Sequence, residues 1–584
     1  MFVLHYANVE NQIKMSFRQS DANRSKPFTL SDEGNSFYVG IAPNIPDEKI
    51  FNSDWEHHPN ILNEMHTAMY IVAYDATGCS FASDASGREL LFYYYSDKDF
   101  IISDSFWEII KIIKPTYQDI NKEIVEEMLC MGGGVPCDHT TPVRNLFWLG
   151  ANFHCHFDSS TWELSINRFS GIQRTGEISN IEDAISGMDK ALQAMAEYLY
   201  CRHPNAIFGL GLSGGLDSRV ALYYLQRAGL RLKCFNTCTR RPHKFLLANS
   251  VKNARMLAKK AQVDYTEVEW SPVALRKKID LMLKNQPFGT GGHYTNLYKY
   301  EPSGMPEFDV LLSAGQGIGP MLVGVSAFAG SDKMSREDII SYLYHLATGE
   351  VRAYSFTENS LRKQFDIWFP NKIDVLQGRY FDIWNQMAPK ETYERIQNKI
   401  IAYVDRCLNE GYRPADVTLD YRTNALGPNG RNGAYESRFN TVQAYTIYTP
   451  FLMQEALKWD INLIEDRRIL KELIRRYIPQ FSDIGEETYG STRSKQSKTS
   501  LLFQKIVFSL RGSGIMADEW YANNPLVKKE FMIDMNNENT WFRSMFPVSE
   551  NVELIWRMSP ARKNSIWDAK RLIDCIEQES YMNF

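Results

Sequence analysis

Short apolar and aromatic runs separated by turn residues dominate the first 180 residues of the chain. Gly, Asp and Ser lie between most of these runs, which is typical of β-strands joined by tight turns. The segment 120–131 instead has helical character and ends at a run of three glycines. The expected strands lie at 68–74, 90–95, 100–103, within 147–157 and at 162–167. The pattern therefore predicts a β-rich first part with one helix.

The pattern changes near residue 180. Residues 180–202 carry apolar side chains at helical spacing, and from residue 206 buried-type strands alternate with helices. We expect strands at 206–212, 230–237, 264–270 and 308–313, with helices between them that end near Gly229 and Lys260. Such alternation predicts a parallel sheet covered by helices on both faces. After residue 327 the pattern is mostly helical, so we expect two domains, 1–180 and 181–584.

Composition narrows the class of protein. With 44% hydrophobic and 23% charged residues, the chain is neither a disordered polymer nor a coiled coil. The net charge of −5 gives no global basic footprint, so we expect no nucleic-acid partner. Nine scattered cysteines make no disulfide framework at this length. We find no signal peptide and no apolar run of about 18 residues, and expect a cytoplasmic enzyme without a membrane partner.

The strongest chemical signal is the string Leu-Ser-Gly-Gly-Leu-Asp-Ser-Arg, where a buried strand turns into a helix. Small residues let the backbone approach an anion closely, and the helix N-terminus directs N–H groups and partial positive charge toward it. A carboxylate beside a bound phosphate requires a divalent cation between them, so Asp217 is the candidate metal ligand. The candidate anion-binding residues are Leu212, Ser213, Gly214, Gly215, Asp217 and Ser218.

This string resembles the pyrophosphate loop (PP-loop) of the ATP pyrophosphatase superfamily, and the chain as a whole resembles asparagine synthetase and its relatives. The resemblance rests further on Asp75 and 83–87, 93–95 and 102–104, on 450–452, on Arg468, Lys471, Ile474 and Pro479, and on 493–495. It implies an α/β protein in which an αββα sandwich like that of N-terminal nucleophile (Ntn) hydrolases precedes a parallel-sheet domain like that of adenine-nucleotide α-hydrolases, with many helices. It also implies ATP and Mg²⁺ as ligands.

The first departure from the family lies at residue 2. Glutamine-hydrolysing relatives have a cysteine nucleophile directly after the initiator methionine, whereas this chain has Phe2, which cannot attack an amide. We therefore expect a silent glutaminase domain. The amine would be ammonia or a substrate amino group. β-Lactam synthetases and lasso-peptide macrolactam cyclases combine a silent first domain with an active synthetase domain, and we place the chain in this branch.

The second departure lies after the fourth expected strand. Relatives carry Ser-Gly-Glu-Gly-x-Asp-Glu there, and its Asp shares Mg²⁺ with the first loop. This chain has Ala-Gly-Gln-Gly-Ile-Gly-Pro at 314–320, which keeps Gly315 as a candidate ATP contact but places Gln316, Gly319 and Pro320 at the three acidic positions. Since phosphates supply most Mg²⁺ ligands in such sites, Asp217 alone can suffice. A nucleotide-binding pseudoenzyme remains the alternative.

Four further candidates follow from the resemblance. Lys495 would stabilise charge on the reacting carbonyl and on the leaving phosphate, although a solvated lysine in a basic run explains it equally well. Gln316 would face the substrate, and Glu436 would be a general base for the amine, with a surface glutamate as the alternative. The main chain of Thr237 would contact adenine.

The resulting hypothesis is an amide-bond synthetase. It would adenylate a substrate carboxylate, release pyrophosphate and join the acyl group to an amine, as in lasso-peptide or other natural-product cyclisation. The partner would be a small molecule or peptide that bears a carboxylate and an amine, with a precursor peptide and a processing protease as further partners. The alternatives are a nucleotide-binding scaffold, an amidotransferase of surface-polysaccharide biosynthesis, and a tRNA-thiolating enzyme, which would normally show a catalytic cysteine pair.

Overall fold

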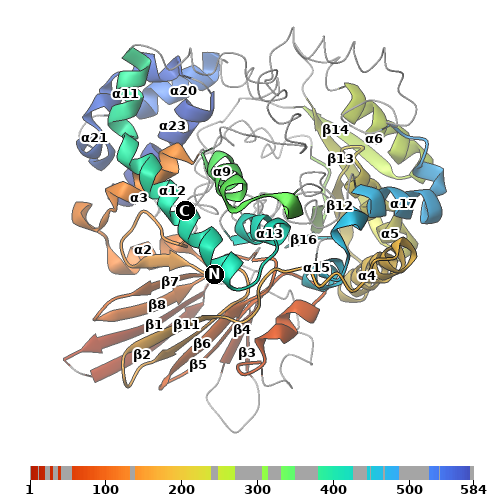
Figure 1. Ribbon diagram of the computed structural model, residues 1–584, viewed down its shortest axis with the longest axis horizontal. Helices are drawn as coiled ribbons and strands as arrows, with labels where there is room; N and C mark the ends of the chain where they lie inside the picture. Colours follow the sequence, from red (N-terminus) through yellow and green to blue (C-terminus); the bar gives the residue numbers. More distant parts are fainter. Residues whose placement is uncertain are drawn as a thin grey trace.

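The computed structural model describes most of the chain, and all structural statements below concern the described residues. These are 2–10, 12–19, 26–29, 37–40, 55–87, 89–131, 138–238, 248–269, 305–313, 331–348, 379–424, 443–447, 449–464, 467–485, 525–537, 540–558 and 560–578. Figure 1 shows an antiparallel sandwich at the lower left, a parallel sheet at the right and helices between them.

Two antiparallel sheets, in the orders β2-β1-β8-β7-β9 and β11-β10-β6-β5-β4-β3, form the first part of the chain. Their facing sides enclose an aromatic core that contains Tyr6, Phe81 and Phe157. The rings of Phe100 and Phe157 stack at 4.0 Å between centroids. The strands are β1 (Phe2–Val9), β2 (Gln12–Gln19), β3 (Lys26–Thr29), β4 (Phe37–Gly40), β5 (Tyr70–Asp75), β6 (Gly78–Ser83), β7 (Phe92–Tyr95), β8 (Asp99–Ser103), β9 (Leu146–Trp148), β10 (Phe153–Asp158) and β11 (Glu163–Arg168).

Helices cover the outer faces of this sandwich. The amphipathic helices α2 (Phe106–Ile113) and α3 (Lys122–Cys130) bury apolar side chains in one core with Val3 and Phe92 of the first sheet. The short 3-10 helix η1 (Pro59–Glu64) contributes Leu62 to a cluster on the other sheet. The layers therefore run helix, sheet, sheet, helix.

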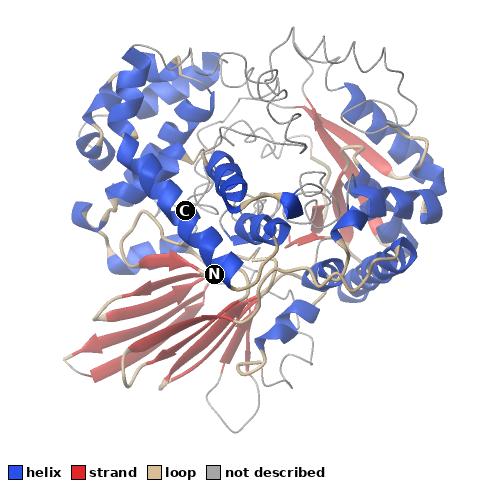
Figure 2. Cartoon of the chain, viewed as in Figure 1, coloured by secondary structure: helices blue, strands red, loops and turns tan. Residues whose placement is uncertain are grey.

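The second part contains a five-stranded sheet in the order β14-β13-β12-β15-β16, with every pair parallel (Figure 2). Counted along the chain this order is 3-2-1-4-5, so the winding direction reverses between β12 and β15. Ligands of such sheets bind at the carboxyl ends of the strands at this switch point. The strands are β12 (Ile207–Gly211), β13 (Arg231–Cys238), β14 (Asp264–Glu269), β15 (Val310–Ser313) and β16 (Gln443–Thr446).

Helices pack on this sheet and continue to the C-terminal end. The helices α4, α5, α15 and α17 share a core with β12 and β15. The described helices of the second part are α4 (Ile181–Arg202), α5 (Leu216–Arg227), α6 (Ala248–Ala261), α9 (Arg336–Ala347), α11 (Arg379–Met387), α12 (Lys390–Asn409), α13 (Pro414–Asn424), α15 (Pro450–Leu457), α16 (Ile461–Ile464), α17 (Arg468–Tyr477), α20 (Pro525–Met535), α21 (Trp541–Met545), α22 (Val552–Trp556) and α23 (Pro560–Glu577). Within the described ranges, no helix is both long and apolar enough to cross a bilayer.

The predicted α/β class is confirmed, with the antiparallel sandwich preceding the parallel sheet. The four strands expected at the centre of the second part are β12 to β15, and the helix expected at 180–202 is α4. The pattern missed the strands β1 to β4 and β6, the helix α2, and β16, which lies in the part expected to be helical.

Two helices from the second part of the chain, α12 and α23, pack against the antiparallel sandwich. The core that contains Val3 also contains Tyr403 of α12 and Trp567 of α23. Beside this core Lys399 Nζ lies 2.8 Å from Oε2 of the buried Glu127 in α3. The division of the chain at residue 180 stays a prediction.

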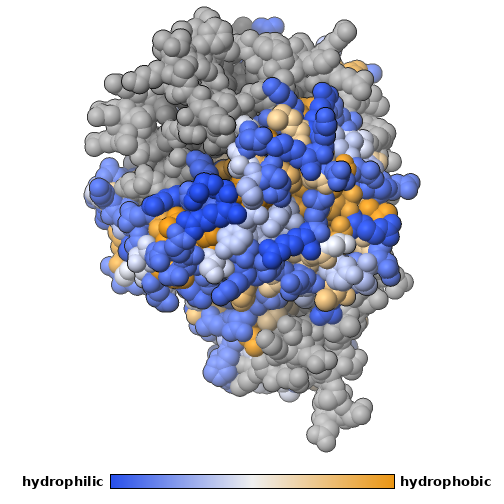
Figure 3. Space-filling model, turned by 90° about the vertical axis from the view of Figure 1, so that its right-hand side faces the viewer, coloured by the Kyte–Doolittle hydropathy of each residue, from blue (hydrophilic) through white to orange (hydrophobic). Residues whose placement is uncertain are grey.

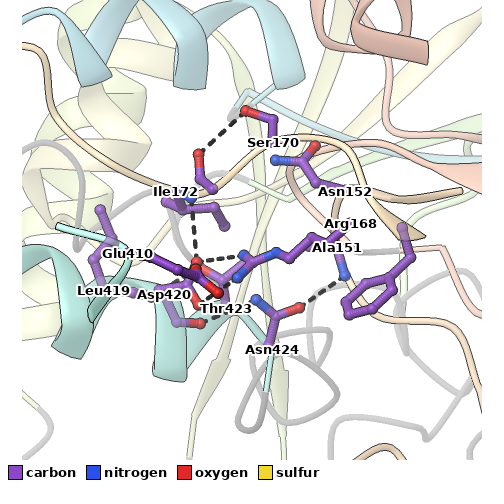
Figure 4. Close-up of polar contacts among 12 residues, drawn as sticks. Ala151, Asn152, Arg168, Ser170, Ile172, Glu410, Leu419, Asp420, Thr423 and Asn424 are labelled. Carbon is purple, nitrogen blue, oxygen red and sulfur yellow. Dashed lines mark hydrogen bonds and ion pairs between the residues drawn. The ribbon is translucent and has the colours of Figure 1, made fainter. Parts of the chain in front are cut away.

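A buried ion pair ties α13 to the end of the sandwich (Figure 4). Arg168 Nη1 donates to Asp420 Oδ2 at 2.8 Å, and the backbone N–H of Ile172 donates to Asp420 Oδ1 at 3.2 Å. Nearby, Asn424 Oδ1 accepts from the backbone N–H of Ala151 at 3.0 Å. Since breaking a buried pair leaves one charge uncompensated, removal of either Arg168 or Asp420 alone would strongly destabilise this contact.

Candidate PP-loop site

The candidate loop begins at the carboxyl end of β12, beside the switch point. The backbone N–H of Leu212 donates to Phe235 O of β13 at 2.7 Å, so the parallel ladder runs one residue past β12. Asn236 Nδ2 donates to Leu212 O at 2.6 Å from the same neighbouring strand. The strand end is thus held on one side before the chain turns into α5.

Gly214 occupies a position that only glycine fits. Its φ of +80° lies in the left-handed region, which side chains disfavour. A Cβ there would also lie 2.5 Å from Asn253 Cβ and 3.1 Å from the backbone N of Ala254 in α6. The turn therefore packs against α6 with no space for a side chain.

The amino end of α5 faces this turn without a capping side chain. Gly215 is the N-cap residue in extended conformation, and α5 begins at Leu216. The first N–H groups of a helix have no intrahelical acceptor, and they carry the positive end of its dipole. Ser213 Oγ accepts from the backbone N–H of Gly215 at 3.1 Å, and Ser218 Oγ donates to Gly215 O at 3.1 Å. The two serines thus stabilise the turn itself.

Asp217 is the second residue of α5 and its carboxylate is mostly buried. Arg467 Nη1 lies 3.6 Å from Asp217 Oδ2, and the side chains are 37% and 14% exposed, respectively. Arg467 is the N-cap residue of α17 and has a φ of +57°, uncommon for a residue with a side chain. The amino ends of α5 and α17 therefore meet, with an acid on one and a guanidinium on the other.

Arg467 is a candidate functional residue that we did not derive from the sequence. Its pairing with Asp217 depends on α17 packing against α5. A local signal does exist, because Arg467 and Arg468 open α17 where the helix dipole disfavours positive charge. Basic residues at such a position are evidence for an anionic partner.

Thr237 lies in β13, two residues beyond Phe235, which pairs with Gly211 of β12. Its backbone is therefore at the same sheet edge as the loop. The other candidates, Gly315, Gln316, Glu436 and Lys495, lie outside the described residues, as do Gly319 and Pro320. Their roles stay predictions.

The loop and the start of α17 bring together helix N-terminal amides and an arginine, which can donate to phosphate oxygens, and one carboxylate, which can ligate a cation. In the described part of the chain, no group of three or more His, Cys, Asp or Glu side chains could hold a metal ion by itself. A cation at Asp217 would take its other ligands from phosphate oxygens and water, as Mg²⁺ usually does. The residues present therefore fit ATP with Mg²⁺.

An aromatic ring occupies residue 2, the position at which the glutamine-hydrolysing members of the resembling family have their cysteine. Phe2 is 1% exposed, and its ring lies 6.3 Å from that of Phe17 and 6.0 Å from that of Tyr70. Its backbone N–H donates to Asp104 Oδ1 at 2.9 Å, and its carbonyl accepts from Ser103 Oγ at 2.5 Å. Residue 2 is thus an ordinary core position of β1.

Comparisons with known proteins add little to this geometry. No family model matches the chain, and no curated protein matches it in sequence. Among solved structures, the chain is similar to the NMN synthetase from Francisella tularensis at 12% identity, over 44% of this chain and 97% of that chain, with a TM-score of 0.19. It is also similar to the NAD⁺ synthetase from Burkholderia pseudomallei at 13% identity, over 41% and 93%, with a TM-score of 0.18. At these scores neither likeness carries an argument.

Proposed function

We propose that this chain is an ATP-dependent carbon–nitrogen ligase that binds the polyphosphate of ATP at the PP-loop. The observation that carries the proposal is the Ser-Gly-Gly-Leu-Asp-Ser string at the switch point of a parallel sheet, with Gly214 in a conformation and a space that exclude a side chain. Uncapped amides and a helix dipole at this point favour a bound polyanion.

Each side chain at the loop has a role in this proposal. Asp217 would hold Mg²⁺, which supplies positive charge between the carboxylate and the phosphate oxygens. Arg467, which pairs with Asp217 in the structure, would contact a phosphate oxygen once the cation takes its place beside the carboxylate. Ser213 and Ser218 keep the turn in shape through Gly215.

The finer proposal is an asparagine synthetase-like enzyme with a silent glutaminase domain. A substrate carboxylate would attack the α-phosphate of ATP, which gives an acyl-adenylate and releases pyrophosphate. An amine would then displace AMP from the acyl-adenylate to give an amide. Because Phe2 is buried and has no nucleophilic group, the sandwich would not release ammonia from glutamine, and the amine would have another source. A macrolactam cyclase that acts on a precursor peptide, after cleavage by a protease, fits this chemistry. So does an amidotransferase of surface-polysaccharide assembly.

Hydroxylamine replaces an unknown amine in the experiment that tests this proposal. The protein is incubated with ATP, MgCl₂, hydroxylamine and a panel of carboxylic acids and carboxylate-bearing peptides. We expect at least one acid to give a hydroxamate with equal amounts of AMP and pyrophosphate. ADP and phosphate as products would contradict the adenylating ligase, as would hydroxamate formed without ATP.

A nucleotide-binding scaffold without catalysis is the second candidate. It is favoured by the run at 314–320, in which Gly319 and Pro320 stand at the positions where relatives have acids. This candidate predicts ATP binding but no AMP from any acid over a titration of free Mg²⁺. The ligase predicts AMP formation that requires more free Mg²⁺ than relatives with both acids, because the protein supplies one carboxylate instead of two.

A further inference from the structure

Arg219 is a buried arginine in the first turn of α5, and its side chain reaches under the PP-loop. The residue is 1% exposed. Its guanidinium donates to main-chain carbonyl oxygens. Nη2 and Nε donate to Gly214 O at 2.9 Å and 3.3 Å, and Nη2 also donates to Gly485 O. Nη1 donates to Ile484 O at 2.8 Å and to Phe481 O at 3.4 Å. A planar guanidinium presents five N–H donors in a rigid fork, so these carbonyls are held in fixed directions.

The bond to Gly214 O determines the orientation of one peptide plane. In a trans peptide the C=O and the following N–H point in opposite directions. With Gly214 O held toward the buried Arg219, the N–H of Gly215 points away from the core, where Ser213 Oγ accepts it. Glycine on both sides of this peptide makes a flip easy, and a flipped peptide would place a carbonyl oxygen where the phosphate binds.

A second buried side chain acts on the same structure from α6. Asn253 is 3% exposed, and its Nδ2 donates to Gly485 O at 2.8 Å, the carbonyl that Arg219 also contacts. Asn253 Cβ is also the atom that a side chain at residue 214 would meet first. Arg219 and Asn253 thus form one buried support beneath Gly214.

We propose that Arg219 is a positioning residue of the PP-loop, which holds the Gly214 carbonyl away from a bound polyphosphate and keeps the loop in its anion-binding form. This inference rests on the proposed function, because it assumes that the loop binds pyrophosphate or the polyphosphate of ATP. Arg219 contacts the loop backbone from the buried side, so its effect on the ligand is indirect.

The experiment titrates wild type, Arg219→Met and Arg219→Lys with inorganic pyrophosphate in MgCl₂, and separately with adenosine. Loss of a charge-assisted hydrogen bond to the loop should weaken pyrophosphate binding by Arg219→Met by about 10- to 100-fold. Binding of adenosine, which has no phosphate, should stay within about twofold by the same energy scale. Arg219→Lys should lie between wild type and Arg219→Met, because one ammonium can hold Gly214 O but cannot hold every carbonyl.

Asn253→Ala provides a second variant should Arg219→Met fail to fold. It removes one support of Gly485 and should weaken pyrophosphate binding severalfold, about as a lost neutral hydrogen bond does. Unchanged pyrophosphate affinity in the folded variants would overturn the inference, as would an equal loss for pyrophosphate and adenosine. A wild type that binds neither pyrophosphate nor ATP would instead overturn the proposed function.

Discussion

Two positions of this chain match places where the resembling family performs chemistry, and the structure treats them in opposite ways. Residue 2, where the resembling family has its glutaminase nucleophile, is a phenylalanine packed between aromatic rings. The PP-loop has small residues, a helix end without a capping side chain and a carboxylate paired with Arg467. A core position can be filled with an aromatic side chain, whereas a site that binds an anion must keep its amides and charges accessible.

Two carboxylates show the same contrast. Asp84, in the turn after β6, is fully buried and accepts from the backbone N–H groups of Met69 and Ser86, the latter at 2.6 Å. Burial raises the pKa of Asp84 to about 6, against the lowering effect of its hydrogen bonds. Asp217 keeps part of its side chain in solvent beside Arg467. The first carboxylate supports a turn through the backbone, whereas the second faces a guanidinium at the amino end of a neighbouring helix.

Asp217→Asn should give the largest change in activity. If the carboxylate holds Mg²⁺ against the polyphosphate, its loss should cost about 3–5 kcal/mol of transition-state stabilisation, roughly 10²–10⁴-fold in AMP formation. The melting temperature without ligand should change little. The matched control is Glu182→Gln, because Glu182 is also the second residue of a helix and also pairs with an arginine of α17, Arg476, at 2.6 Å. AMP formation that is equal in both variants would show that Asp217 is misassigned.

Phe2→Ala should produce the largest loss of stability. Truncating a buried phenylalanine leaves a cavity and lowers the free energy of unfolding by about 3–5 kcal/mol. Urea unfolding followed by tryptophan fluorescence measures this loss, with Phe17→Leu, a less buried position on β2, as a milder control.

Phe2→Cys should release no glutamate from glutamine. Glutamate formation above a no-enzyme blank would contradict the interpretation of a filled site.

Asp84→Asn should alter how stability depends on pH. The pKa of Asp84 is about 6 in the folded chain and about 3.9 when unfolded, so between these values the folded state retains a proton that the unfolded state has lost. Wild type therefore loses up to about 3 kcal/mol of stability from this group as the pH rises from 4 to 6. Asn does not titrate, so the stability advantage of wild type over the variant should shrink by that amount. An advantage independent of pH would contradict the raised pKa of Asp84.

Arg467→Met should have the smallest of these effects. An arginine that is one third exposed contributes modestly, so we expect ATP affinity to fall about tenfold, or about 1.4 kcal/mol. The matched control is Arg476→Met, which removes a guanidinium from the other end of α17. The ratio of the two dissociation constants, measured by calorimetry, should be about ten. A ratio of one would exclude Arg467 from the site.

The parallel sheet and its loop were predictable because their signals are local. Strands β12 to β15 alternate with helices, and the loop string is contiguous. The missed β2 alternates the apolar residues Ile13, Met15 and Phe17 with polar residues, so a local strand signal was present and leaving this strand out was an error of interpretation. The missed β16 has four residues and is defined by its pairing with β15, more than a hundred residues earlier. A pattern within one segment cannot show such a pairing.

The buried support of the loop could not be predicted for a similar reason. Arg219 is adjacent to the string, but its acceptors at Phe481, Ile484 and Gly485 come from a distant segment. The pairing of Arg467 with Asp217 likewise depends on how α17 packs against α5. Sequence patterns locate the part of a site carried by one loop, whereas the groups that position this loop depend on tertiary packing.

Hydrogen exchange followed by mass spectrometry, with and without ATP and MgCl₂, tests the contrast between the two positions most directly. The parallel sheet lies at the right in Figure 1, and Figure 3 shows that side of the molecule coloured by hydropathy. The PP-loop account predicts slower exchange in peptides that cover the loop and the first turn of α5, and at the start of α17. It predicts no change in peptides from β1. Protection of β1, or unchanged exchange of the loop at saturating ATP, would contradict it.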